Sequence, residues 1–200
     1  MHKDVVIVGA GPAGIFTALE MLKKGSRQKI LIVEKGRAVE ERRCPKNKTG
    51  QCVSCRPYCH ITTGFSGAGA FSDGKLSLSY EVGGDLPSLI GAEKAQETID
   101  YADKIYLEFG ADSHVEGLGN TEEVKAIRKR AIRAGLKLVD CPIRHLGTEK
   151  AQELYYAIER HLLENGVEIL FGYECTNLIL DGAVCRGVRA ANGKEEMEIT

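Results

Sequence analysis

The first 34 residues join an apolar run, a glycine-rich turn, a helical segment and a second apolar run that ends in an acid. Val5–Val8 has the composition of a buried parallel strand. A helix is predicted from about Pro12 to Lys24, where Gly25 ends it. The second strand lies in "KILIVEKG" and ends at Glu34. This arrangement is a βαβ unit, so the sequence predicts an α/β fold built on a parallel sheet.

The turn between the first strand and the helix carries the G-x-G-x-x-G spacing of a dinucleotide-binding site. The first glycine permits the tight turn, the second lets the backbone approach a pyrophosphate, and the third lets helix and strand pack closely. The helix N-terminus supplies N–H groups and a positive dipole end for the phosphates. The predicted cofactor-binding residues here are Gly9, Gly11, Pro12, Ala13 and Gly14.

An acid follows at the end of the second strand, which is the position that binds ribose hydroxyls in such folds. Glu34 is predicted to accept these hydrogen bonds, with Lys35 beside it as a further cofactor contact. A carboxylate at this point repels a 2′-phosphate, which argues against NADP. The fingerprint by itself does not distinguish FAD from NAD.

The composition excludes several classes of partner. With 200 residues, a net charge of −1 and a pI near 6.5, the chain gives no support for nucleic acid as a partner. No apolar run approaches the length of a bilayer span. The first residues show no secretory signal, so a cytoplasmic location is expected. The odd number of cysteines, seven, fits reduced thiols better than a disulfide framework.

Beyond the βαβ unit, the pattern predicts a largely irregular segment over residues 36–86, then helices, strands and a final β-meander. The apolar stripes of two amphipathic helices are Ala92, Ala95, Ile99, Ala102, Ile105 and Phe109, and then Val124, Ile127, Ala131 and Ala134. Further predicted elements are a strand over 136–140, a helix over 148–165, a strand over 167–171 and a meander over 175–200.

These elements predict one cofactor domain that is interrupted by an insert. The first part of the cofactor-binding domain covers residues 1–84, a helical insert covers 85–135, and the second part covers 136–200. The chain ends within a predicted meander strand, so we expect the sequence to be the N-terminal portion of a longer protein.

Several stretches together resemble one known family. They are "VVIVGAGPAGIFTALEM", "VEKG", "CVSC…CHITTGFSGAGAFSDGKLS", "CPIRHLGTEK" and "GVEILFGYEC". The chain resembles the uncharacterised FAD-dependent dehydrogenases of the glutathione-reductase-type flavoprotein superfamily along essentially its whole length. The resemblance implies FAD, with its adenosine half on the βαβ unit. It also implies that the backbone of Cys175 lies near the adenine.

A second glycine-rich stretch, "TTGFSGAGAFSDGKLS", suits the close approach of a flat ring or a phosphate. The alternative is a mobile surface loop, but Phe65, Phe71 and Leu76 among the glycines favour a buried, ordered segment. By resemblance this stretch runs along the FAD toward the isoalloxazine, where Lys75 would stabilise negative charge on the reduced flavin. The predicted cofactor-binding residues here are Gly67, Ala68, Gly69, Ser72 and Lys75.

The segment "CPKNKTGQCVSCRPYC" leaves three interpretations open. The spacing of Cys52, Cys55 and Cys59, with Cys44 before them, fits thiolate ligands for zinc or an iron–sulfur cluster. A redox-active dithiol of Cys52 and Cys55 beside Arg56 is a second interpretation. Reduced thiols in a long loop are the third. Cys141, Cys175 and Cys185 are expected to be small buried side chains.

The function predicted from these features is FAD-dependent oxidoreduction, with hydride or electrons passing through a bound flavin. The alternatives are a nucleotide-binding Rossmann module without redox activity and an NAD-dependent dehydrogenase. The substrate is a small molecule whose identity, like that of the electron acceptor, the sequence does not specify. The fragment is expected to need further residues for a complete substrate site.

Overall fold

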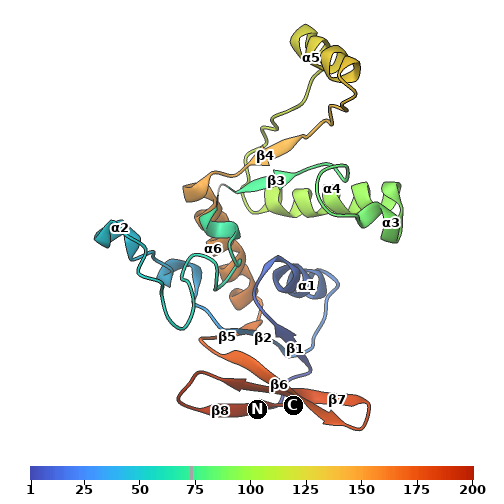
Figure 1. The fold of residues 1–200 in the computed structure, drawn as a ribbon. Helices are drawn as coiled ribbons and strands as arrows, with labels where there is room; N and C mark the ends of the chain where they lie inside the picture. The colour runs from blue at the N-terminus through green and yellow to red at the C-terminus, as the bar shows by residue number, and fades with distance from the viewer. Residues whose placement is uncertain (73) are drawn as a thin grey trace. The chain divides into compact units, whose positions relative to one another are not determined.

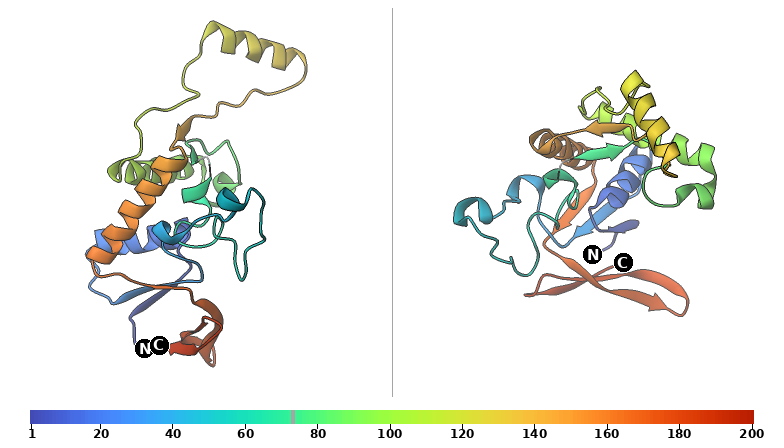
Figure 2. Two further views of the ribbon diagram at one scale, coloured as in Figure 1. Left: turned by 90° about the vertical axis from the view of Figure 1, so that its left-hand side faces the viewer. Right: turned by 45° about the horizontal axis from the view of Figure 1, so that its top comes forward.

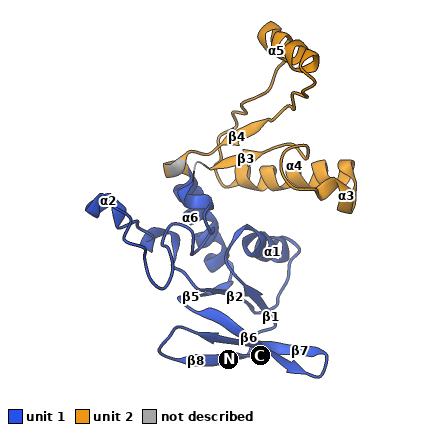
Figure 3. Ribbon diagram, viewed as in Figure 1, with its two compact units in different colours: residues 1–72, 151–200 blue, residues 73–150 orange. Residues whose placement is uncertain are grey.

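The computed structural model describes residues 1–72 and 74–200 and divides into two compact units (Figure 3). The first unit comprises residues 1–72 and 151–200, and the second comprises 73–150. The second unit extends beyond the insert predicted over 85–135 at both ends. The predicted domain boundaries therefore stay a prediction, and each unit is described here by itself.

A three-stranded parallel sheet forms the centre of the first unit (Figure 1). Its strands, in spatial order, are β1 (Val5–Val8), β2 (Ile30–Glu34) and β5 (Glu168–Phe171). Val5 pairs with Ile30 and Leu31 pairs with Glu168, so the ends of β1, β2 and β5 are aligned. The predicted strands and their parallel arrangement are confirmed by this register, and β2, the central strand, is buried along its whole length.

Two helices and a second sheet cover the two faces of this parallel sheet (Figures 1 and 2). The helices are α1 (Pro12–Lys23) and α6 (Thr148–Glu164), and they bury apolar side chains such as Ile15 and Ile158. The opposite layer is an antiparallel meander. Its strands are β6 (Glu174–Asp181), β7 (Val184–Ala191) and β8 (Glu196–Ile199).

The fully buried strand β2 supplies core residues to both layers. Leu31 and Val33 form a cluster with Val188, Ala190 and Ile199 of the meander. Because side chains alternate along a strand, Ile30 and Ile32 point to the face that the helices cover. The layers are therefore joined through alternate residues of a single strand.

Both ends of the described chain lie beside the meander, as Figure 2 shows from two directions. The backbone N–H of Lys3 donates to the carbonyl of Thr200 at 2.9 Å, and the N–H of Thr200 donates to the carbonyl of Met1 at 2.9 Å. These hydrogen bonds hold the residues that precede β1 beside the end of β8.

The irregular segment of the first unit contains only short helical turns within its described residues. They are η1 (Val39–Glu41), α2 (Lys46–Thr49) and η2 (Gly69–Phe71). The predicted irregular character of this segment is confirmed. No residue of α2 is buried, so this turn contributes little to the core.

The second unit contains a two-stranded antiparallel ribbon and three helices among its described residues. The ribbon pairs β3 (Lys75–Ser77) with β4 (Ile143–His145). The helices are α3 (Leu86–Ile90), α4 (Ala92–Glu108) and α5 (Glu122–Arg133). In the part of the chain that the structure describes, none of the helices has both the length and the apolar character needed to cross a membrane.

The strand predicted over 136–140 is wrong, because this segment has no regular structure. Arg128 of α5 donates to the carbonyl of Leu138 at 3.1 Å and to the carboxylate of Asp140 at 2.6 Å. These contacts attach the segment to a helix instead of a sheet, and Leu136 is exposed. The strand of this region forms a few residues later, as β4.

Burial differs from what apolar patterning and cysteine content suggest, and the predicted burial of three cysteines is wrong. The apolar stripe of α5 is not buried, and Ile127 is 44% exposed. Its period of 3.6 predicts the helix correctly but does not establish that a partner covers the stripe. Among the cysteines expected to be buried, Cys141 and Cys175 are half-buried and Cys185 is exposed.

The core of the first unit contains a titratable group, a buried acid on α6. Glu159 is 3% exposed, and its carboxylate accepts a hydrogen bond from the Val39 N–H at 3.1 Å. Burial raises the pKa of Glu159 from 4.5 to about 7, against the Val39 hydrogen bond. Glu40 and Glu41 add to the rise in this pKa, and Arg42 opposes it.

We expect Glu159→Gln to remove a pH dependence from the free energy of unfolding. The folded state holds this proton more tightly than the unfolded state does, so the contribution is fully present below pH 4.5 and is lost as the pH rises through about 7. Each pKa unit is worth about 1.4 kcal/mol, so wild type should lose about 2–3 kcal/mol across this window. Glutamine keeps an acceptor for Val39.

Urea denaturation at pH 5 and pH 8 measures this difference. The control is Glu153→Gln, an exposed acid on the same helix, which should keep the wild-type pH profile. Identical pH profiles for wild type and Glu159→Gln would show that Glu159 titrates normally in the folded chain.

Candidate functional site

The turn between β1 and α1 has the backbone geometry that its glycines predict. Gly9 has a φ of +95°, a conformation that favours glycine. A Cβ on Gly14 would lie 2.0 Å from the Gly9 carbonyl oxygen, so the helix starts directly against the turn. A Cβ on Gly11 would meet nothing within 4 Å. The open side of the turn is therefore at Gly11, where the predicted pyrophosphate would approach.

The N-terminus of α1 is available to an anion. Gly11 is the N-cap residue, and no side chain caps the helix. Pro12 occupies the first turn, which also lacks an acidic residue. The first N–H groups of a helix have no intrahelical partner and lie at the positive end of its dipole. This end of α1, including Ala13 and Gly14, suits a phosphate.

Glu34 has a structural role that the sequence did not reveal. The residue is 6% exposed, and its carboxylate accepts hydrogen bonds from the Ala10 N–H and the Gly36 N–H, both at 2.8 Å. The carboxylate thus holds the fingerprint turn to the end of β2. A carboxylate offers about four acceptor positions, so two remain for the predicted ribose contact.

The second glycine-rich stretch lies against the fingerprint turn. The N–H of Ser66 donates to the Ala10 carbonyl at 2.7 Å, and the N–H of Phe65 donates to the Arg37 carbonyl at 3.0 Å. A Cβ on Gly36 would lie 2.4 Å from the Gly64 nitrogen, so there is no room for a side chain between the two backbones. The structure therefore brings two segments predicted to bind the cofactor together within one unit.

Arg42 organises this stretch, and sequence reasoning missed it. Its buried guanidinium donates to the carbonyls of His60, Ile61, Phe65 and Gly67. Burial lowers the pKa of Arg42 to about 10, which still leaves the group charged near neutral pH.

The guanidinium also lies 4.4 Å from the centre of the Phe71 ring, a cation–π contact. A single charged side chain thus fixes the backbone between His60 and Gly67. This backbone leads directly into Ala68 and Gly69, which were predicted to contact the cofactor.

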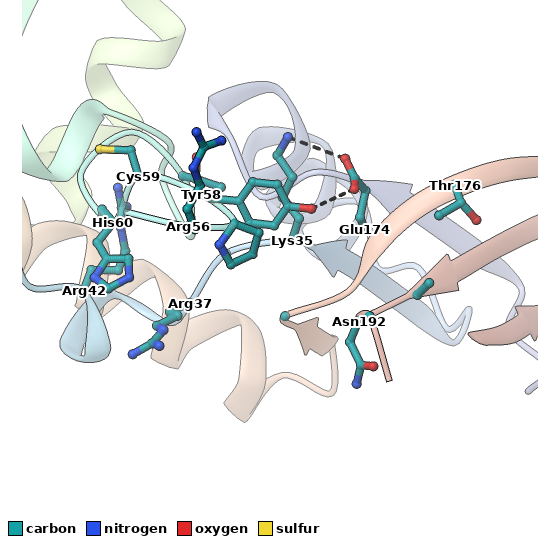
Figure 4. A pocket seen from close by; sticks show the side chains of 16 residues that line it. Lys35, Arg37, Arg42, Arg56, Tyr58, Cys59, His60, Glu174, Thr176 and Asn192 are labelled. Atoms are coloured by element: carbon teal, nitrogen blue, oxygen red, sulfur yellow. Dashed lines mark hydrogen bonds and ion pairs between the residues drawn. The ribbon is translucent and has the colours of Figure 1, made fainter. Parts of the chain in front are cut away.

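A cavity of about 370 Å³ opens beside the residues that follow Glu34 (Figure 4). Its lining includes Lys35 and Gly36 after β2, and Glu174 and Thr176 on β6. Further lining residues are Arg37, Arg42, Arg56, Tyr58, His60 and Asn192. The basic side chains among them make the cavity a suitable place for an anionic or phosphate-bearing ligand.

Three side chains attach the cysteine-containing loop, residues 44–59, to the edge of this cavity (Figure 4). The Tyr58 hydroxyl donates to the Glu174 carboxylate at 2.7 Å, which raises the pKa of Tyr58. Lys35 Nζ lies 3.8 Å from the same carboxylate and 4.7 Å from the centre of the Tyr58 ring. The predicted cofactor residue Lys35 therefore also holds Tyr58 over the cavity.

The remaining predicted cofactor residues differ in their placement. Cys175 lies on β6 between two residues that line the cavity, while its side chain packs against the core cluster. The predicted contact of the Cys175 backbone with the adenine stays a prediction. Ser72 ends the first segment of unit 1, whereas Lys75 belongs to the second unit and pairs with His145. Their contacts with a cofactor stay predictions.

The four cysteines of the loop, together with His60, line a second cavity of about 270 Å³. All four are free thiols. Backbone N–H groups of Ile61 and Thr62 lower the pKa of Cys59. Among residues 1–72 and 74–200, no three side chains of His, Cys, Asp or Glu are placed to hold a metal ion.

Comparison with known proteins agrees with this geometry. Residues 4–42, which contain the fingerprint turn and Glu34, match the model of the FAD binding domain family. An uncharacterized protein of Clostridium beijerinckii is 40% identical over 72 residues, which cover 36% of this chain and 13% of that protein. The match of the first segment favours FAD over NAD as the dinucleotide.

Solved structures share the fold of nearly the whole chain. The 3-ketosteroid-delta4-(5alpha)-dehydrogenase from Rhodococcus jostii is 15% identical, with a TM-score of 0.55 over 99% of this chain and 44% of that one. Glycine oxidase from Bacillus cereus is 16% identical, with a TM-score of 0.51 over 98% and 54%. The chain thus spans about half the length of these proteins. These likenesses confirm the predicted α/β, Rossmann-like fold.

Proposed function

We propose that this chain binds FAD through its first unit and forms the cofactor-binding part of an FAD-dependent oxidoreductase. The observation that carries the proposal is the fingerprint turn, whose open side at Gly11 faces the uncapped N-terminus of α1. The turn also lies within the segment that matches the FAD binding domain. The membership in the FAD-dependent dehydrogenases indicated by resemblance and a cytoplasmic location are further parts of the proposal.

The residues present fit the two ends of the adenosine diphosphate half of FAD. The pyrophosphate would be held by N–H groups of Ala13 and Gly14 at the start of α1. The ribose would bind Glu34, whose orientation is fixed by two backbone hydrogen bonds. The adenine would enter the cavity of about 370 Å³, along the backbone of Cys175.

When bound, FAD supplies hydride or electron transfer at its isoalloxazine. The chain's own contribution is to bind and orient the cofactor. Arg42 holds the backbone from His60 to Gly67 in place, so Gly67, Ala68 and Gly69 are presented in one conformation beside the fingerprint turn. The substrate that meets the flavin is expected to be a small molecule.

Glu34→Ala is expected to weaken FAD binding by about 1–3 kcal/mol, the scale of a hydrogen bond to a charged group. It also removes the acceptor for Ala10 and Gly36, so the fold must be monitored in parallel by thermal unfolding. Fluorescence titration of added FAD measures the affinity.

The control for this titration is Glu168→Ala, an exposed acid on β5 that binds Lys3 and lies outside the predicted site. It should leave FAD affinity unchanged. Equal FAD affinity in wild type and Glu34→Ala would show that Glu34 does not bind the ribose of FAD.

A further inference from the structure

The cysteine-containing loop is closed at its base by hydrogen bonds from both directions. Arg42 Nε donates to the carbonyl of His60 at 2.9 Å, and Arg42 also donates to the carbonyl of Ile61. His60 Nδ1 lies 3.0 Å from the carbonyl oxygen of Arg43. These contacts bring Cys44 and Cys59, the first and last cysteines of the loop, to the same end of it.

The contact of His60 with a carbonyl occupies one of its two ring nitrogens. A carbonyl oxygen can only accept a hydrogen bond, so the contact uses Nδ1 as the donor and leaves Nε2 outside it. Histidines that bind metals commonly donate their other ring N–H to a backbone carbonyl or a carboxylate. Nε2 of His60 is therefore the ring nitrogen that a metal ion would contact.

All the thiols of this loop line a single cavity with that histidine. Cys44, Cys52, Cys55, Cys59 and His60 surround about 270 Å³. None of the cysteines forms a disulfide, and Cys52 and Cys59 are exposed. Thiols that serve only as small apolar side chains are normally buried, so this arrangement differs from simple core packing.

We propose that this cavity binds a thiolate-ligated metal centre, with zinc and an iron–sulfur cluster as the two forms that its ligands can hold. Thiolate sulfur with imidazole nitrogen is the donor set of structural zinc sites, and cysteine thiolates hold iron–sulfur clusters. Lys46 and Arg56 line the same cavity. Their positive charge would offset the negative charge of several metal-bound thiolates.

Metal binding would contract the loop. No three candidate ligands in the described part of the chain converge on one ion-sized point, so the ligands surround a space that is larger than a single ion. The only regular element within the described loop is α2, which has no buried residue. Moving it inward disrupts no core packing, and metal sites commonly form together with local folding of their ligand loop.

The test is metal and acid-labile sulfide analysis of the chain after anaerobic purification. About one zinc per chain, or iron with a matching amount of sulfide, supports the proposal, and the two results distinguish the two forms. Cys52→Ser combined with Cys55→Ser should lose the metal. Cys185→Ser, which changes an exposed thiol outside the loop, should keep it.

A second readout uses the unaltered chain, so it does not depend on whether a variant folds. With metal bound, the loop thiols should react slowly with a thiol reagent and become reactive after a chelator is added. Metal-free protein whose loop thiols react at once, both before and after incubation with zinc or with iron and sulfide, overturns the proposal. Both readouts report the metal alone, so they are independent of FAD binding.

Discussion

Gly11→Val should abolish FAD binding while the chain keeps its fold. Gly11 has a φ of −75° and a ψ of 177°, which valine adopts without strain, and a Cβ there meets nothing within 4 Å. The branched side chain would instead occupy the space that the pyrophosphate needs. We expect affinity to fall roughly a hundredfold or more, about 3 kcal/mol, with little change in the thermal midpoint.

Gly14→Ala is the informative comparison for this variant. Its Cβ would lie 2.0 Å from the Gly9 carbonyl oxygen, so it should lower both FAD affinity and stability. Fluorescence titration and thermal unfolding of the two variants separate loss of binding from loss of fold. Wild-type FAD affinity in Gly11→Val would mean that the fingerprint turn is not the pyrophosphate site.

Arg42→Met is expected to destabilise the first unit by at least about 2–3 kcal/mol, because a single hydrogen bond to a charged group is worth about 1.5–3 kcal/mol and several are lost. The carbonyls of His60, Ile61, Phe65 and Gly67 would lose their common donor. Methionine fills much of the volume but supplies no N–H groups. Because the backbone between His60 and Gly67 would loosen, FAD affinity should fall as well.

Urea denaturation measures the loss in stability, and Arg43→Met is the matched control. Arg43 is the neighbouring arginine, and its side chain is exposed. It should cost less than about 0.5 kcal/mol, as surface substitutions usually do. Equal stability of the two variants would show that the Arg42 hydrogen bonds contribute nothing net to the fold.

The βαβ unit could be predicted because its signals are local. The glycine spacing, the apolar strands and Glu34 lie within one short segment, and each has a fixed structural meaning. The close contact of Gly14 with Gly9 follows from the same pattern. The meander was predicted for a similar reason, since Asp181-Gly182 and Asn192-Gly193 mark its turns.

The role of Arg42 could not be predicted, because its partners come from a distant part of the chain. Nothing in "EERRCP" distinguishes it from Arg43, yet one is buried and the other exposed. The same limit applies to Glu34, whose bonds to Ala10 and Gly36 depend on how β2 is placed beside β1. Local pattern predicts elements, whereas the partners of buried polar groups depend on tertiary structure.

The errors in the second unit have a related cause. Residues 136–140 alternate like a strand, but Arg128 binds Leu138 and Asp140 and draws the segment to α5. The apolar stripe of α5 predicts a helix and leaves open what contacts it. A periodic pattern therefore predicts secondary structure more reliably than it predicts burial.

The most direct test of the account is the flavin content of the purified chain. A folded preparation should show the absorbance bands of oxidised flavin, or acquire them on titration with FAD, and should release about one FAD per chain on denaturation, because the fold provides one fingerprint site. A folded chain that binds no FAD under titration, but binds NAD or another nucleotide, would contradict the proposal and favour an NAD-dependent dehydrogenase or a non-redox nucleotide-binding module.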